Sequence, residues 1–130
     1  MAFTTSLLTS YLDDCNIKYE TVEQFVSFEY DNRMFIGYIR QLPVFEGSLG
    51  LVLLQIGDVS PFEVKQYLKL INKLNYDADV VKYVYNEEHN SIDVGAEVPL
   101  DSSPELDDLV PGLVKLLLHA HDVFNKAIGK

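Results

Sequence analysis

The sequence predicts a single α+β domain over residues 1–130, with an antiparallel sheet of about five strands and three helices. Two observations lead to this class. A chain of 130 residues with 48% hydrophobic residues has the size and composition of one ordinary globular domain. Its hydrophobic pattern also changes repeatedly between a period of two and helical spacing, in the order α-β-β-β-α-β-β-α. Short turns join successive strands, which indicates antiparallel hairpins.

The first predicted element is an amphipathic helix over residues 4–15. Thr4 or Thr5 is suited to its N-cap, and Asn16 to its C-terminal end. The apolar residues at helical spacing are Leu7, Leu8, Tyr11, Leu12 and Cys15. At such a position Cys15 is expected to be a small core residue rather than a nucleophile.

Three strands follow. Residues 18–30 alternate with a period of two, with one interruption at Gln24, and Asp31-Asn32 forms a tight turn into a second strand over 33–42. After a loop over 43–48, residues 49–56 are apolar at both odd and even positions. Such a strand is typical of a sheet interior that is covered on both faces.

The strongest local signal is the sequence Ser60-Pro61-Phe62-Glu63. Serine at the N-cap, proline in the first turn and glutamate three residues after the serine form a capping box, which predicts a helix over 60–75. Three basic residues lie on the outer ridge of this helix: Lys65, Lys69 and Lys73.

Two further strands are predicted over residues 78–85 and 91–98, joined by a turn at 87–90. In the first of them one face carries Val81, Tyr83 and Tyr85, and the other face carries Val80 and Val84. In the second, apolar residues alternate with Asp93, Gly95 and Glu97, so one face is expected to be in contact with water.

The final helix contains Pro111, which cannot donate a backbone hydrogen bond and restricts the residue before it. Ser102-Ser103-Pro104-Glu105 is a second capping signal, so the helix either begins there and kinks at Pro111, or restarts with Asp108 as N-cap. The restart is the preferred interpretation. From Leu113 onwards only a narrow strip is polar, which predicts a helix that is covered on more than one side.

No catalytic, cofactor-binding or metal-binding constellation is present in the sequence. His119 and His121 are two residues apart on a helix and point in different directions, so they cannot share a metal ion. His119 and Asp122 are spaced to form an exposed pair, while Asp77 and Asp79 lack the glycine and distal glutamate of a calcium loop. The sequence therefore predicts a protein that is not an enzyme and has no cofactor.

Composition restricts the class of partner. Twenty acidic and ten basic residues give a net charge of −10, which disfavours nucleic acid and anionic membrane surfaces. The single cysteine excludes an internal disulfide, and neither a signal peptide nor an apolar stretch of membrane-spanning length is visible. The expected location is the cytoplasm.

The whole pattern resembles the YbjN family, described as proposed bacterial sensory transduction regulators, whose fold is similar to that of type III secretion chaperones. The resemblance extends over residues 5–128. The local points that carry it are Leu74-Asn75 after the second helix, the strand from Asp93 to Pro99, and Asp122 near the end. None of these is a catalytic residue, so the resemblance implies no active site.

The resemblance implies a cytoplasmic bacterial homodimer that binds a polypeptide client or a regulatory partner. A dedicated secretion chaperone for one client and a small-ligand-sensing regulatory domain are the alternatives. The residues predicted to form an interaction surface are Lys65, Lys69, Lys73, Val81, Tyr83 and Tyr85.

Overall fold

The computed structural model describes residues 3–43 and 47–130; part of the predicted loop over 43–48 therefore lies outside the described residues. The α+β class and the predicted order of helices and strands are confirmed. The elements are α1 (Thr5–Asp14), β1 (Tyr19–Val22), β2 (Phe25–Tyr30), β3 (Arg33–Arg40), β4 (Gly47–Asp58), α2 (Val64–Asp77), β5 (Lys82–Asn86), β6 (Ser91–Leu100) and α3 (Leu106–Ala127).

The strands form one six-stranded antiparallel sheet in the order β1-β2-β3-β4-β6-β5. The sixth strand arises because the predicted strand over 18–30 folds into a hairpin. Glu23 adopts a left-handed φ of 56°, and the chain turns there so that Val22 pairs with Phe25. The predicted turn between β2 and β3 is present, with left-handed backbone at both Asp31 and Asn32, as a two-residue turn between twisted strands requires.

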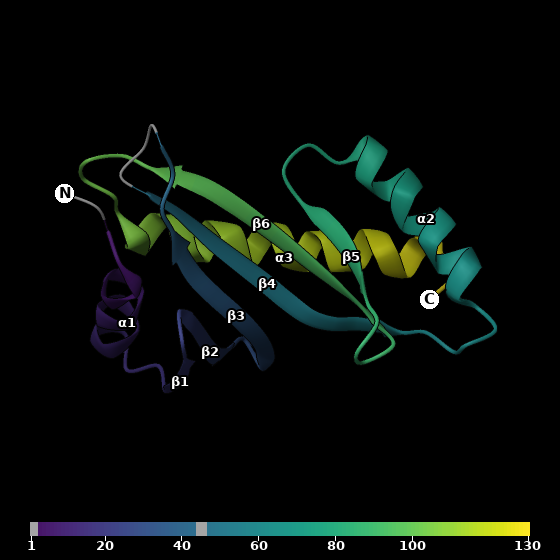
Figure 1. The fold of residues 1–130 in the computed structure, drawn as a ribbon, viewed down its shortest axis with the longest axis horizontal. Coiled ribbons are helices and arrows are strands. Elements are labelled where there is room, and N and C mark those ends of the chain that lie inside the picture. The colour runs from purple at the N-terminus through teal and green to yellow at the C-terminus, as the bar shows by residue number, and fades with distance from the viewer. Residues whose placement is uncertain (1–2, 44–46) are drawn as a thin grey trace.

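The helices cover one face of the sheet and one edge (Figure 1). α3 runs behind the sheet and packs on β4 and β6, and α1 packs on β2 and β3 beside it. α2 lies against β5, at the edge of the sheet. The opposite face of the sheet, which Figure 1 presents to the viewer, has no helix over it among the described residues.

The core lies between the covered face and the helices. Because side chains alternate along a strand, one set of strand positions points into this layer. β3 contributes Phe35 and Ile39, and β4 contributes every second residue from Leu49 to Leu53. The largest fully buried side chains are Phe28, Phe35, Phe124, Leu8, Leu12, Leu49, Leu51, Leu53, Ile92, Leu100, Leu117 and Val26.

Among the described residues, helices supply the predicted cover on only one of the two faces of β4. Leu49, Leu51 and Leu53 are buried beneath the helices, whereas Val52 and Leu54 on the other face are only half-buried. Their apolar character does not come from a second layer within this chain.

The capping prediction for the second helix is also wrong. α2 begins at Val64, with Glu63 at the N-cap position. Residues from Ser60 onward form a separate turn, in which the Glu63 amide donates to the Ser60 carbonyl at 2.9 Å. The Ser60 hydroxyl donates to the Glu63 carboxylate at 2.8 Å instead of accepting from a backbone amide. The two side chains satisfy each other and so do not cap the helix.

α3 is continuous from Leu106 to Ala127 and contains Pro111 in its second turn. The preferred restart at Asp108 is wrong. The carbonyl that loses its partner at Pro111 belongs to the exposed residue Asp107, where water can replace the missing donor, so the helix need not break.

Cys15 was expected in the core but is exposed. It follows the last turn of α1, and the next residue, Asn16, turns the chain with a left-handed φ of 57°. The thiol therefore lies at the C-cap, outside the buried face of α1 that carries Leu8 and Leu12.

Candidate functional site

The helix-free face of the sheet, here called the open face, carries apolar side chains on β1, β2, β3, β4 and β5. Strand pairing places Phe25 next to Tyr38, and Ile36 next to Val52. The most exposed apolar residues that share this face by alternation are Val22 (67% exposed), Val84 (54%), Val80 (47%), Met34 (45%) and Phe25 (41%). Exposed apolar residues are unremarkable singly, but a contiguous group marks an interaction surface.

Tyr38 connects three strands across the open face. Its ring lies over Gly50 on the neighbouring strand β4, so closely that a Cβ at Gly50 would come within 2.1 Å of the ring. The tyrosine hydroxyl then reaches the second neighbour, β6, and donates to the Glu97 carboxylate at 2.8 Å. Gly50 therefore makes room for Tyr38, which covers a stretch of backbone that no helix covers.

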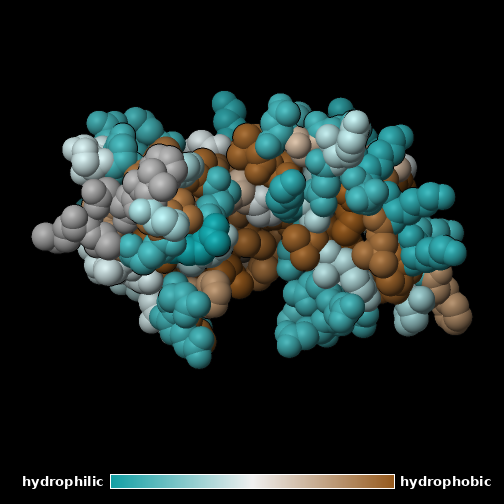
Figure 2. All heavy atoms as spheres, turned by 45° about the horizontal axis from the view of Figure 1, so that its top comes forward, coloured by the Kyte–Doolittle hydropathy of each residue, from teal (hydrophilic) through white to brown (hydrophobic). Residues whose placement is uncertain are grey.

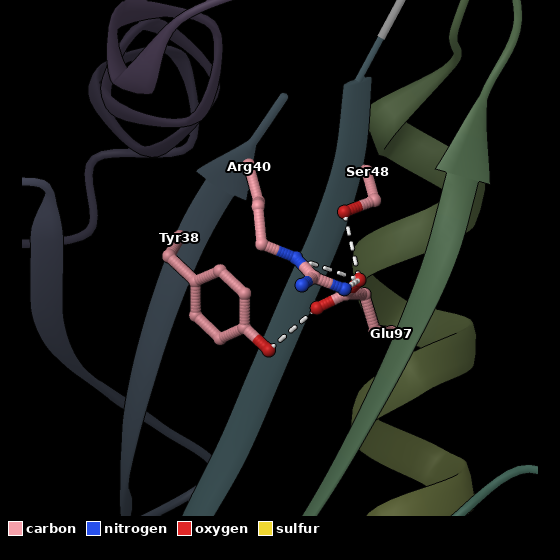
Figure 3. Close-up of polar contacts among 4 residues, drawn as sticks. All are labelled: Tyr38, Arg40, Ser48 and Glu97. Carbon is pink, nitrogen blue, oxygen red and sulfur yellow. Dashed lines mark hydrogen bonds and ion pairs between the residues drawn. The ribbon is translucent and has the colours of Figure 1, made fainter. Parts of the chain in front are cut away.

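Glu97 interacts with three polar side chains at one end of the open face (Figure 3). It accepts from the Tyr38 hydroxyl, from the Ser48 hydroxyl at 2.9 Å and from Arg40, with which it also forms an ion pair. Burial alone would raise the pKa of Glu97, but the hydrogen bonds from Arg40, Tyr38 and Ser48 outweigh it and hold the pKa below its ordinary value. Burial, and then the bond to Glu97, raise the pKa of Tyr38 to about 12. Both groups therefore keep fixed protonation states near neutral pH.

A shallow hollow of about 530 Å³ lies beside this cluster, lined by residues of β3, β4, β5 and β6. Its lining includes Val52, Gly95 and Ala96, together with the basic residues Arg40 and Lys82. Figure 2 shows hydrophobic side chains at the surface in the middle of the molecule and towards the end that carries α2, with hydrophilic side chains around them. An apolar surface with polar groups at its edge is a common composition for a protein interface.

The predicted interaction residues are not all accessible. Val81 and Tyr83 are buried, with 7% and 4% of their surface exposed, because they point towards α3 and not away from it. Tyr85 is half-buried and donates to the Asn90 side chain at 2.8 Å. Val80 and Val84, on the opposite side of the same segment, are the exposed residues there.

Lys65, Lys69 and Lys73 are exposed on α2. Their spacing of four residues places them along one ridge of the helix, here called the lysine ridge. The ridge lies on the helix that borders the sheet, and its role as an interaction surface stays a prediction.

The histidines are arranged differently from the predicted pair. His119 and Asp122 are both exposed on α3, and no hydrogen bond or ion pair joins these two residues. His121 instead meets Arg33 at the start of β3, where the guanidinium contacts the imidazole Nδ1. Burial of the ring, and then the Arg33 charge, lower the pKa of His121. Sequence spacing could not reveal this contact, because the two residues lie 88 positions apart.

Within residues 3–43 and 47–130, no group of three or more potential ligands could hold a metal ion. In the same ranges, no helix has the length and apolar composition to cross a bilayer.

No family model matches the sequence, and no curated protein matches it. A solved structure does match: the crystal structure of YbjN from E. coli, described as a proposed transcription regulator, superimposes with a TM-score of 0.66. The superposition covers 98% of this chain and 93% of that one. The chain has the YbjN fold. The YbjN-like architecture predicted from the sequence is thereby confirmed, over nearly the whole length of both proteins.

Sequence identity with YbjN is 13%, so the likeness concerns the fold and transfers no individual residue. Function belongs to sites placed on a fold and is not fixed by the fold itself. What this chain does must therefore be argued from its own surfaces.

Proposed function

We propose that the chain is a non-enzymatic protein-binding module that forms a homodimer through its open face and binds a polypeptide or regulatory partner. The observation that carries the proposal is that, within residues 3–43 and 47–130, helices cover one side of the six-stranded sheet and leave the other bare. The bare side presents apolar residues on β1, β2, β3, β4 and β5, which a stable interface would remove from water. The similarity to YbjN, described as a proposed regulator, supports a regulatory setting.

The charges on the open face support self-association better than the net charge of −10 suggests. Strand alternation places Arg40 and Lys82 on this face together with Glu20, Glu29 and Glu97. Basic and acidic groups are therefore mixed around the apolar centre. Charges that lie farther from the interface than a Debye length, about 8 Å at physiological salt, are largely screened.

The lysine ridge is the proposed contact for the second partner. It is a basic strip on an acidic molecule, and it lies on α2 rather than on the open face. A partner with an acidic segment can therefore bind there while the sheet faces its dimer mate. The single cysteine, which excludes an internal disulfide, fits the cytoplasmic location that we propose.

Dimerisation is tested by light scattering coupled to size exclusion at micromolar protein and moderate salt. We expect twice the monomer mass of 14.8 kDa. Ile36→Lys places a charge in the centre of the open face and should return the mass to that of a monomer. Leu68→Lys, at an exposed apolar position of α2, is the matched control and should leave the dimer intact. A monomer mass for the unmodified protein would contradict the proposed interface.

The lysine ridge is tested separately, by cross-linking in the native cell followed by mass spectrometry. A variant with Lys65, Lys69 and Lys73 all changed to Gln should lose a specific cross-linked partner but keep the dimer mass. The same partner yield from both proteins would exclude the ridge as the contact.

A further inference from the structure

A partly enclosed cavity lies between α2, the segment before β5 and α3, and the proposed dimer interface shares only Val80 with its lining. Its volume is about 440 Å³, within the range of about 300–1,000 Å³ typical of small-molecule sites. Its walls are mostly aliphatic, and its polar residues are Asp77, Asp79 and His119, together with Tyr83. We propose that this cavity binds a small organic cation, an ammonium group carried on a compact apolar body.

The walls are held in place by Tyr83. Its backbone amide donates to the Asn75 side chain at 2.7 Å, and its carbonyl accepts from the same side chain at 2.9 Å, which fixes the end of α2. Its hydroxyl donates to the Ala120 carbonyl of α3 at 2.7 Å. One residue thus ties together all three elements around the cavity. A cavity whose walls are already fixed requires little ordering when a ligand enters, which favours binding.

Tyr83 itself offers the ligand no polar group. Its hydroxyl is already bonded to Ala120, and its ring stacks against Phe124 with centroids 6.3 Å apart. Most of the other lining residues are aliphatic, among them Leu74, Val81 and Leu116. The inner part of the cavity therefore selects an apolar body.

The acidic residues that line the cavity favour a ligand with a positive charge. Asp77 and Asp79 are both exposed and line the cavity. Within residues 3–43 and 47–130, the ion pair of the structure joins Arg40 to Glu97 and gives neither aspartate a basic partner. The net charge of −10 further enriches cations, and depletes anions, near the surface. An apolar body with a positive group at its end satisfies both parts of the site.

Three probes with the same aromatic body test the proposal: phenethylamine, phenethyl alcohol and phenylacetate. Each is titrated into 15N-labelled protein while the backbone amide shifts are followed by NMR. The shifts should concentrate at Ala78, Val80, Val81 and Val123, and the amine should bind more tightly than the alcohol, with the carboxylate weakest. Equal affinity for the amine and the alcohol, shifts confined to other surfaces, or no shifts at all would overturn the proposal.

Variants separate the two parts of the site. Changing Asp77 and Asp79 together to Asn should weaken amine binding by about tenfold, as expected for the loss of two exposed charge pairs, and leave the alcohol unaffected. The matched control changes Glu87 and Glu88 to Gln in the turn after β5, which alters the net charge equally and should leave both affinities unchanged. A tenfold loss in that control would mean that only the overall charge attracts the amine, and would contradict a site.

Val123→Trp checks that the ligand enters the cavity itself. Val123 lines the mouth and is partly exposed, so the larger side chain can fill the opening without entering the core. Binding of both the amine and the alcohol should be lost while the remaining amide spectrum is retained. Unchanged binding would exclude this cavity. Asp77 lies one helical turn after Lys73, but neither the ridge lysines nor Ile36 line the cavity. Failure of the ligand titration would therefore leave the proposed dimer untouched, and the reverse also holds.

Discussion

The side-chain amide of Asn75 occupies the place that a neighbouring strand would take beside β5. Edge strands expose unpaired backbone groups that can recruit other chains, and Asn75 accepts from the Tyr83 amide and donates to the Tyr83 carbonyl. Asn75→Ala should lower the free energy of unfolding by about 1–3 kcal/mol, because both half-buried backbone groups lose their partner. Urea denaturation measures the loss, and hydrogen exchange at the Tyr83 amide should accelerate.

Asn72→Ala is the control for that experiment. Asn72 lies on the same helix and is exposed, so the same substitution there should change stability by no more than about 0.5 kcal/mol. Equal effects of the two variants would mean that α2 responds to the change in helix propensity and that the contact to β5 contributes nothing.

His121 should make stability depend on pH. Its pKa is lowered from 6.5 in the folded protein, by burial and then by Arg33, against weaker opposing effects of Asp122 and the Ile56 backbone. The unfolded chain therefore binds the proton more readily than the folded one, and stability rises with pH in this window. The stability gained from neutral His121 is complete above pH 6.5. It is lost as the pH falls towards the pKa of His121 in the folded protein.

Urea titrations between about pH 7.5 and about pH 5 follow this loss, and His121→Gln should flatten it. Glu97 affects stability at lower pH. Its pKa is lowered from 4.5 in the folded protein. Its stabilising effect is therefore present above pH 4.5 and is lost as the pH falls through the pKa of the folded state. A slope near pH 6 that survives in His121→Gln would assign the effect to another group.

The continuity of α3 leads to a prediction at Pro111. In an uninterrupted helix over Leu106–Ala127, Pro111→Ala restores a hydrogen bond to the Asp107 carbonyl and removes the steric conflict with it. We expect stabilisation by about 1–2 kcal/mol, less than the full proline penalty of about 3 kcal/mol because the site is near the helix start and solvated. The thermal unfolding midpoint measures it. If the helix restarted at Asp108, proline would be favourable in the first turn and the variant would be no more stable than the parent.

For the molecule as a whole, a dimer through the open face makes stability depend on concentration. Association shifts the folding equilibrium by mass action, so a tenfold rise in protein concentration should add about 1.4 kcal/mol per mole of dimer. The thermal midpoint should rise accordingly in the unmodified protein and stay constant in Ile36→Lys. A constant midpoint in both would show that the open face is exposed in a stable monomer.

Much of this architecture follows from local patterns in the sequence. Periods of two and helical spacing located the sheet and the three helices, because alternation on a strand and helical repetition are properties of neighbouring residues. The tight turn at Asp31-Asn32 was predictable because these residue types tolerate left-handed backbone. Helix starts were predicted less well: the Ser60 hydroxyl had two possible partners, a backbone amide and the Glu63 carboxylate, and spacing favours both equally.

The candidate sites depend on contacts between residues that are distant in the chain. Alternation predicted the two faces of the β5 segment, but not that Val81 and Tyr83 point towards α3 and so leave the surface. Gly57 illustrates the reason: it must lack a side chain because Phe124 of α3 lies 2.7 Å from where its Cβ would be, and nothing near Gly57 in sequence indicates that. A pattern establishes which residues share a face, whereas only the packing of all elements decides whether that face is buried, bare or part of a cavity.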